Sequence, residues 1–183
     1  MPDTDAAITV LPASMEMLTP LGELDYGFRV TREFIAVFDR PVSQNLKRVE
    51  AYEKHYFNDP QQFSAYVDSV DSALFIVQRQ QQLAGYLAVS RNWNGLALVE
   101  DIAVDRHARQ LGCGRALMDA AVQWAREKNL SGLVLETQSN NVPACLFYEQ
   151  YGFELAGIDR ALYRALNPQR SETALFWYLW LNL

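Results

Sequence analysis

The chain has 183 residues, of which 50% are hydrophobic and 21% are charged, a composition typical of soluble globular proteins. This length can bury one sizeable core, so we expect a single domain over residues 1–183. The formal net charge of −6 disfavours nucleic acid as the main partner, because phosphate binding needs a basic surface. It fits a small cationic partner better, since an acidic site attracts amines.

The N-terminus lacks the basic start and apolar segment of a signal peptide, and no apolar run approaches the roughly 20 residues that cross a bilayer. We therefore expect a cytoplasmic protein that does not bind membranes. Cys113 and Cys145 are too few for a disulfide framework and are expected to be reduced and packed. His55 and His107 stand apart from any metal-ligand pattern, so no metal is predicted.

The first part of the chain predicts strands with a variable segment after them. Residues 7–11 form a candidate strand, and residues 15–38 combine a helical candidate with a strand from Phe28 to Phe38. Residues 39–70 interleave aromatic and charged side chains. This pattern fits a peripheral helix with half-buried aromatics, and equally a segment that contacts a substrate.

The middle of the chain predicts a hairpin, a strand, a glycine turn and a helix. Apolar runs at 74–77 and 83–89 flank a Gln-rich turn, and a further strand spans 96–104. The segment Arg109-Gln110-Leu111-Gly112-Cys113-Gly114 follows and opens an amphipathic helix that ends near Lys128. Such a turn leaves unpaired N–H groups at the positive end of the helix dipole. Because glycines let an anion approach the backbone, the turn suits a phosphate or pyrophosphate.

The last part predicts a strand, a capped helix and a final strand. Residues 133–137 read as a strand, and Asn141 is a candidate N-cap for a helix that Gly152 ends. Residues 174–181 read as a buried strand. The order of elements predicts an α/β (α+β) fold, with a mixed central β-sheet and helices on both faces.

Two motifs together resemble the GNAT superfamily of N-acetyltransferases. The glycine turn is similar to the superfamily's acyl-CoA pyrophosphate loop, and Asn141, Ala144 and Tyr148 match its Asn-x-x-Ala-x-x-x-Tyr helix. The resemblance spans residues 96–153 and implies a GNAT fold whose sheet is splayed at the acyl-CoA site. It implies acetyl-CoA as co-substrate, bound by the following residues: Ile102, Ala103, Val104, Arg109, Gln110, Leu111, Gly112, Cys113, Gly114, Arg115 and Asn141.

A closer resemblance is to streptothricin acetyltransferases, which acetylate the β-lysine amine of an antibiotic. It is carried by residues 91–94, 99–102, 136–145 and 172–178. Within these segments, Trp93 and Glu136 recur in the antibiotic-modifying enzymes, where they could equally serve packing and strand pairing. The glycine turn departs from the usual pattern, which has Gly at Gln110 and a branched aliphatic residue at Cys113.

Glu100 and Asp101 are the candidate acidic residues. They stand in an apolar strand, where a carboxylate is costly unless it faces a cleft or has a partner. Strand alternation would send them to opposite faces, but the resemblance implies a bulge at this point. We interpret Glu100 as the general base, acting through a water, and Asp101 as a contact for the substrate ammonium. The alternative is a structural hydrogen-bond acceptor at either position.

Tyr148 matches the superfamily's tyrosine near the CoA sulfur, which implies that it donates a proton to the departing thiolate. The alternative is a core aromatic on a helix. Arg109 and Arg115 are candidate partners of the pyrophosphate. Arg106 is assigned either to the 3′-phosphate or to solvent, and a backbone N–H at Ile102 or Val104 is the candidate for polarising the thioester carbonyl.

The sequence therefore predicts an acetyl-CoA-dependent N-acetyltransferase that acts on a primary amine of a small cationic molecule, with streptothricin as the specific expectation. Alternative acceptors are a polyamine, a lysine-like metabolite or a protein N-terminus. A non-catalytic acyl-CoA-binding module is the alternative from another functional class. A homodimer is an open alternative to a monomer.

Overall fold

A polar turn joins the two apolar runs near the centre of the chain. Gln80 and Gln81 have positive φ angles of 52° and 65°, and turns with this geometry match the twist of paired antiparallel strands. The flanking runs form β4 (Ser72–Arg79) and β5 (Gln82–Arg91), which pair antiparallel along their length. The predicted hairpin is confirmed.

The structure is a computed structural model that describes residues 7–169 and 172–181. Its other elements, in chain order, are β1 (Ile8–Pro12), η1 (Met15–Met17), α1 (Leu18–Gly22), β2 (Phe28–Phe34), η2 (Val42–Gln44), β3 (Leu46–Lys54), η3 (Pro60–Tyr66), β6 (Ala97–Val104), η4 (Arg106–Ala108), α2 (Cys113–Glu127), β7 (Gly132–Gln138), α3 (Val142–Tyr151), β8 (Glu154–Asp159) and β9 (Ala174–Trp180).

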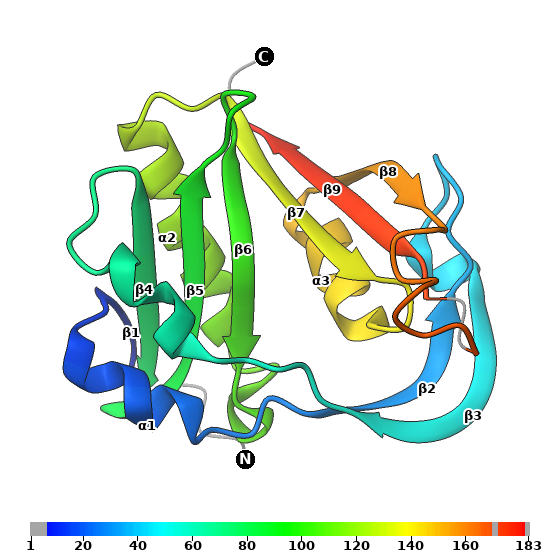
Figure 1. Cartoon of the computed structure of the whole chain (residues 1–183), viewed down its shortest axis with the longest axis horizontal. Helices are drawn as coiled ribbons and strands as arrows, with labels where there is room; N and C mark the ends of the chain where they lie inside the picture. The colour runs from blue at the N-terminus through cyan, green and yellow to red at the C-terminus, as the bar shows by residue number, and fades with distance from the viewer. Residues whose placement is uncertain (1–6, 170–171, 182–183) are drawn as a thin grey trace. The chain divides into compact units, whose positions relative to one another are not determined.

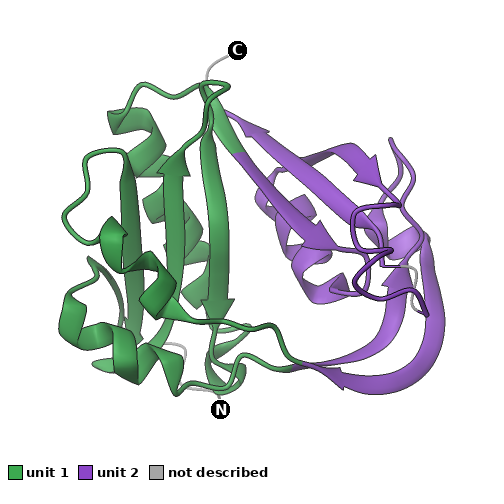
Figure 2. Cartoon of the chain, viewed as in Figure 1, with its two compact units in different colours: residues 1–27, 55–133 green, residues 28–54, 134–183 purple. Residues whose placement is uncertain are grey.

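These elements form two compact units, coloured separately in Figure 2. Unit 1 contains residues 7–27 and 55–133, and unit 2 contains residues 28–54 and 134–181 of the described chain. The fold is a mixed α/β arrangement with mostly antiparallel strands and flanking helices, which confirms the predicted fold class. The single domain over residues 1–183 stays a prediction.

Unit 1 contains antiparallel strands in the order β1-β4-β5-β6. Helix α2 packs on one face of these strands, and α1 covers the other face together with η3 (Figure 1). The apolar stripe that α2 buries consists of Cys113, Leu117, Met118, Ala121, Val122, Trp124 and Ala125. Because this stripe packs α2 against the sheet, the glycine turn at the start of α2 lies at the end of the helix that covers this face.

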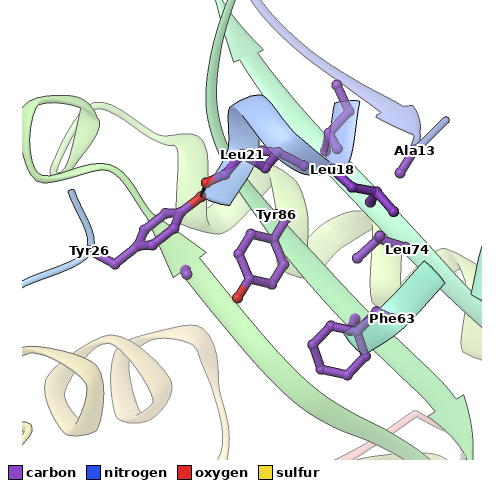
Figure 3. Packing of buried hydrophobic residues seen from close by; sticks show 10 residues of the cluster. Ala13, Leu18, Leu21, Tyr26, Phe63, Leu74 and Tyr86 are labelled. Carbon is purple, nitrogen blue, oxygen red and sulfur yellow. Dashed lines mark hydrogen bonds between the residues drawn. The ribbon is translucent and has the colours of Figure 1, made fainter. Parts of the chain in front are cut away.

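Tyr86 of β5 lies at the centre of the core under α1 and η3. Its ring centroid is 5.6 Å from that of Tyr26 and 6.4 Å from that of Phe63, and Figure 3 shows the Tyr86 ring between these two rings. Leu21 of α1 and Leu74 of β4 belong to the same buried cluster. This packing fixes the position of the Tyr86 hydroxyl on the face that α1 and η3 cover.

Unit 2 contains an antiparallel pair, β2 with β3, and strands in the order β7-β9-β8. Helix α3 begins as predicted, because the Asn141 side chain accepts a hydrogen bond from the Ala144 N–H at 3.2 Å. It ends at Gly152, whose φ of 115° lies in the left-handed region. The Asn141 N-cap and the Gly152 stop are both confirmed.

For the segment 39–70, the sequence left two interpretations open: a peripheral helix, or a segment that contacts the substrate. Residues 46–54 form the strand β3, so the peripheral helix is wrong there. Its half-buried positions include Leu46, Val49 and Tyr52, and this spacing of three resembles a helical period. The register with β2 shifts between Val30 and Arg32, and such a bulge interrupts the two-residue alternation that marks a strand.

Candidate active site

The Arg109–Gly114 loop has the backbone geometry that its sequence predicts. Gly112 is the N-cap of α2 with a φ of 91°, and no side chain caps this end of the helix. Gln110 also has positive φ, at 60°. Left-handed residues alternate with others in this loop, an arrangement that turns backbone N–H groups into a concave anion site. The first N–H groups of an α-helix have no acceptors within the helix, so this end of α2 has the geometry of an anion site.

Arg109 and Arg106 are tied to the backbone around Gly27. The Arg109 guanidinium donates to the carbonyl oxygens of Val104 at 3.0 Å, Gly27 at 2.9 Å and Tyr26 at 2.7 Å. Arg106 donates to the Gly27 carbonyl at 3.2 Å and forms an ion pair with Asp25, also at 3.2 Å. Arg109 therefore positions the loop it begins, and its contact with the pyrophosphate stays a prediction.

Glu100 stands at a register shift between β5 and β6. Asp101 pairs with Ala88 while Val99 pairs with Val89, so Glu100 is the extra residue of a β-bulge. Ser90 donates a hydrogen bond to Glu100, and Tyr86 donates one to Asp101. Ser90 and Tyr86 are four residues apart on β5 and share a face. The bulge thus brings the two neighbouring carboxylates to the same face of the sheet.

The partners of these carboxylates come from the segment before the hairpin as well as from β5. The Tyr66 hydroxyl of η3 donates to Glu100, and the Asn58 side-chain amide donates to both oxygens of Asp101, at 3.2 and 3.1 Å. The sequence prediction missed Asn58, Tyr66 and Tyr86. For Asn58 and Tyr66, the only signal was the interleaving of aromatic and charged residues in 39–70, which admitted a role near the substrate, whereas Tyr86 lies in the predicted strand 83–89 and carried no such signal.

Burial and hydrogen bonding keep the phenols of this site protonated. Burial, and then the hydrogen bond to Glu100, raise the pKa of Tyr66 to about 12. Burial and the charge of Asp101 raise the pKa of Tyr86. Burial also raises the pKa of Asp101, against the opposing effect of the hydrogen bonds from Tyr86 and Asn58.

Neither carboxylate forms an ion pair with a cation of the described residues. Their hydrogen-bond donors are hydroxyl and amide groups, which stabilise a negative charge without cancelling it. Two carboxylates on one face without a counter-ion create a negative potential. Such a site attracts an ammonium group.

The predicted site residues divide between the two units. Glu100, Asp101, Ile102–Val104 and residues 109–115 belong to unit 1, whereas Asn141 and Tyr148 belong to unit 2. Ile102, Ala103 and Val104 pair with Leu87, Tyr86 and Gly85 of β5. In the first turn of α2, Cys113 is buried, Gly114 is half-buried and Arg115 is exposed, while Leu111 before it is 37% exposed.

Tyr148 is buried on α3, with 5% of its surface exposed. Its ring centroid lies 5.8 Å from that of Phe153 and 6.2 Å from that of Trp177. This packing restricts the ring, so the hydroxyl has a defined position. Its role as proton donor stays a prediction.

The remaining candidates show no sign of nucleophilic or metal chemistry. Cys113 and Cys145 are free and buried, and burial raises the pKa of both thiols, that of Cys145 to about 12. Within residues 7–169 and 172–181, no group of three or more His, Cys, Asp or Glu side chains could hold a metal ion. Among the helices of these residues, none has the length and hydropathy to cross a membrane.

Comparisons with known proteins point to one family. The sequence pattern of the acetyltransferase (GNAT) family matches residues 37–153. Streptothricin acetyltransferase A of Bacillus subtilis is 40% identical over 127 residues, 69% of this chain and 72% of the relative. Streptothricin acetyltransferase of Escherichia coli is 33% identical over 172 residues, 93% of this chain and 94% of the relative.

Solved structures agree with these sequence matches. A Bacillus anthracis protein provisionally named a streptothricin acetyltransferase, solved in complex with acetyl coenzyme A, superposes with a TM-score of 0.86 at 33% identity. The superposition covers 96% of this chain and all of the other. Nourseothricin acetyltransferase superposes with a TM-score of 0.76 at 29% identity, over 94% of this chain and 98% of the other.

Proposed function

This chain belongs to the acetyltransferase (GNAT) family, and we propose that its acceptor is a small cationic amine, specifically the β-lysine amine of streptothricin. The donor is acetyl-CoA, in keeping with the family and with the acetyl-CoA complex of the similar Bacillus anthracis protein. The protein is thus an acetyl-CoA-dependent N-acetyltransferase. The proposal concerns which amine receives the acetyl group, and which residues carry the reaction.

The observation that carries the proposal is the pair Glu100 and Asp101. A bulge places both on one face, and hydroxyl and amide donors hold them without neutralising them. A substrate with several ammonium groups gains Coulomb energy from both carboxylates, whereas an uncharged acceptor gains none. This supports a multiply charged amine such as streptothricin over a neutral one.

The Arg109–Gly114 loop fits the pyrophosphate of acetyl-CoA. Gly112 has a left-handed backbone, which strains any other residue at that position, and a Cβ built there would lie 3.1 Å from the Ile8 side chain, which would have to shift slightly. We propose that residues 109–115 hold the phosphates through backbone N–H groups and arginine side chains. Ile102–Val104 and Asn141 would hold the pantetheine. When bound, acetyl-CoA supplies an acetyl group activated as a thioester.

Residues of this chain would carry out the two proton transfers of the reaction, one from the amine and one to the departing thiolate. An alkylammonium has a pKa of about 10.4 in water, so the acceptor must lose a proton before it can attack at neutral pH. We propose that Glu100 accepts this proton through a water and that Asp101 contacts the ammonium before it is deprotonated. The Tyr148 hydroxyl would supply the proton that the CoA sulfur takes up on release.

Two further features of the proposal concern the state of the enzyme. A cytoplasmic location is consistent with the free cysteines Cys113 and Cys145, which persist in a reducing compartment. A homodimer would require a second copy of the chain, and it remains a proposal alongside a monomer.

A thiol-release assay with acetyl-CoA tests the choice of acceptor. The panel should contain streptothricin, spermidine, lysine and a peptide with a free N-terminal alanine. We expect the highest kcat/KM with streptothricin. A higher value with the peptide would contradict the proposal and favour a protein N-terminal acetyltransferase, while binding of acetyl-CoA without turnover of any amine would favour a regulatory module.

A further inference from the structure

Glu100 receives two hydrogen bonds at the same oxygen. The Tyr66 hydroxyl and the Ser90 hydroxyl both donate to Oε1 of Glu100. Tyr66 belongs to η3 and Ser90 to β5, so the two donors come from different elements of unit 1. A carboxylate held by one donor can still turn about that hydrogen bond. Two donors from different elements therefore fix the orientation of the Glu100 carboxylate.

The other oxygen of Glu100, Oε2, accepts no hydrogen bond from the residues that the structure describes. Its neighbour Asp101 differs, because both Asp101 oxygens accept from Asn58 and one also accepts from Tyr86. Glu100 is exposed, whereas Asp101 is half-buried. Of the four carboxylate oxygens of this pair, Oε2 of Glu100 is thus the one left to meet a water or a substrate.

Both donors to Glu100 keep their own protons in the pH range of an enzyme assay. Burial, and then the hydrogen bond to Glu100, raise the pKa of Tyr66 to about 12, and a serine hydroxyl does not ionise in this range. The Tyr66 ring also packs on Phe63 of the same η3, with the ring centroids 5.3 Å apart. The hydrogen bonds at Oε1 can therefore persist while Oε2 gains and loses a proton.

We propose that Tyr66 and Ser90 are positioning residues for the general base, and that by holding Oε1 of Glu100 they direct Oε2 toward the water that carries the proton. The inference rests on the proposed function, because it concerns the base assigned there. In this step the N–H bond of the ammonium breaks, the nitrogen keeps the electron pair, and the proton passes through the water to form an O–H bond at Oε2.

Steady-state kinetics of Tyr66→Phe and Ser90→Ala test the proposal. Each variant removes one donor and leaves the charge of Glu100 in place. With the best amine of the panel, kcat should fall by about ten- to a hundredfold, because a misplaced catalytic group costs this much. KM for the amine and for acetyl-CoA should stay unchanged. A wild-type kcat in either variant would overturn the role of that residue.

A double-mutant cycle separates positioning from general damage to the fold. If Tyr66 acts through Glu100, adding Tyr66→Phe to Glu100→Gln should cause no further loss of kcat, since the base is already absent. An equal loss in the two backgrounds would overturn the positioning role. Ser90→Thr keeps a hydroxyl and should recover most of the activity that Ser90→Ala loses. A Ser90→Thr enzyme as slow as Ser90→Ala would overturn the role of the Ser90 hydroxyl.

Unit 1 also offers matched controls. Ser72 pairs with Ser90 across β4 and β5, but its hydroxyl donates to the Ser69 hydroxyl at 2.8 Å. The Tyr26 hydroxyl donates to the Leu21 carbonyl oxygen at 2.7 Å and not to a carboxylate. Ser72→Ala and Tyr26→Phe should therefore keep the wild-type kcat. A loss equal to that of the matching test variant would overturn the proposal, because the removal of any hydroxyl would then suffice.

The wild-type enzyme separates this inference from the proposed function. If wild type acetylates none of the amines, the proposed function fails and the positioning role fails with it. If wild type is active and Glu100→Gln is impaired, while Tyr66→Phe and Ser90→Ala keep the wild-type kcat, the positioning role fails and the proposed function stands.

Discussion

Glu100 and Asp101 are neighbours in the sequence of β6, yet both side chains lie on the face of the sheet that α1 and η3 cover. Glu100 is bonded by Ser90 and Tyr66, and Asp101 by Tyr86 and Asn58. The register shift at Glu100 makes this possible, because an ordinary strand would point adjacent side chains to opposite faces. Two carboxylates of one strand can therefore act on one substrate.

Glu100→Gln should lower kcat/KM at neutral pH by about 10²–10⁴-fold, because general base catalysis is usually worth this much. Raising the pH should restore part of the loss, since more of the amine then arrives neutral. The pH–rate profiles of wild type and variant check this. A variant with the wild-type profile would leave Glu100 as a structural acceptor for Tyr66 and Ser90.

Asp101→Asn should mainly raise KM for a multiply charged amine and leave kcat nearly unchanged, because it removes a charge without removing the base. The KM for spermidine and streptothricin measures this effect. A fall in kcat with constant KM would assign the base to Asp101 instead.

The same variant should change the dependence of stability on pH. Burial raises the pKa of Asp101 above its ordinary value of 3.8 in the folded protein. The contribution of the Asp101 carboxyl to the free energy of unfolding is therefore largest below pH 3.8, and it declines as the pH rises through the raised pKa. The asparagine side chain does not titrate, so Asp101→Asn should gain stability relative to wild type over this acid range. Urea unfolding of both proteins at several pH values measures this difference. If Asp101→Asn instead loses stability relative to wild type as the pH rises, the pKa of Asp101 is not raised in the folded protein.

Gly112→Asp should abolish acetyl-CoA binding, because it adds a side chain and a negative charge where we place the pyrophosphate. Gly95→Asp is the matched control: Gly95 has a φ of 83°, and a Cβ there would meet nothing within 4 Å. Both variants carry similar backbone strain. Calorimetric titration should detect acetyl-CoA binding to the Gly95→Asp variant alone; equal affinities would place the phosphates elsewhere.

Tyr148→Phe should lower kcat by about 10²–10⁴-fold with little change in KM, because the ring stays and only the proton donor is lost. Tyr151→Phe, on the same helix and in contact with Phe147 and Phe153, is the control and should retain wild-type kcat. Wild-type turnover by Tyr148→Phe would make Tyr148 a packing residue.

Gln110→Gly should stabilise the protein by about 1 kcal/mol, because a φ of 60° is unfavourable for a residue other than glycine. The departure from the usual glycine at this position thus has a measurable cost. Gln123→Gly in the exposed face of α2 should instead destabilise by a similar amount. Thermal unfolding of the two variants measures both changes in stability. If Gln110→Gly destabilises the protein, the positive φ of Gln110 is not a source of strain.

Local signals explain which parts of the site were predictable. The positive φ of Gly112, the Asn141 cap and the Gly152 stop each depend on one residue and its immediate neighbours, so the sequence alone indicated them. Asn58 and Tyr66 lie 43 and 34 residues from the carboxylates they bind, and no local pattern encodes such pairs.

The strand β3 was hidden for a different reason. The register shift places extra residues in β3 between Arg48 and Tyr52, which disturbs the two-residue alternation, and the half-buried positions of β3 resemble those of a helix. Glu136 was visible only as a residue shared with antibiotic-modifying enzymes. Its hydrogen-bond donor, the Tyr163 hydroxyl, is 27 residues away in the chain, and no local pattern encodes such a pair.

Identification of the product tests the central claim most directly. Wild-type enzyme is incubated with acetyl-CoA and streptothricin, and tandem mass spectrometry then locates the added acetyl group. We predict one acetyl group, on an amine of the β-lysine arm. Unmodified streptothricin, in the presence of enzyme that acetylates another amine, would contradict the claim.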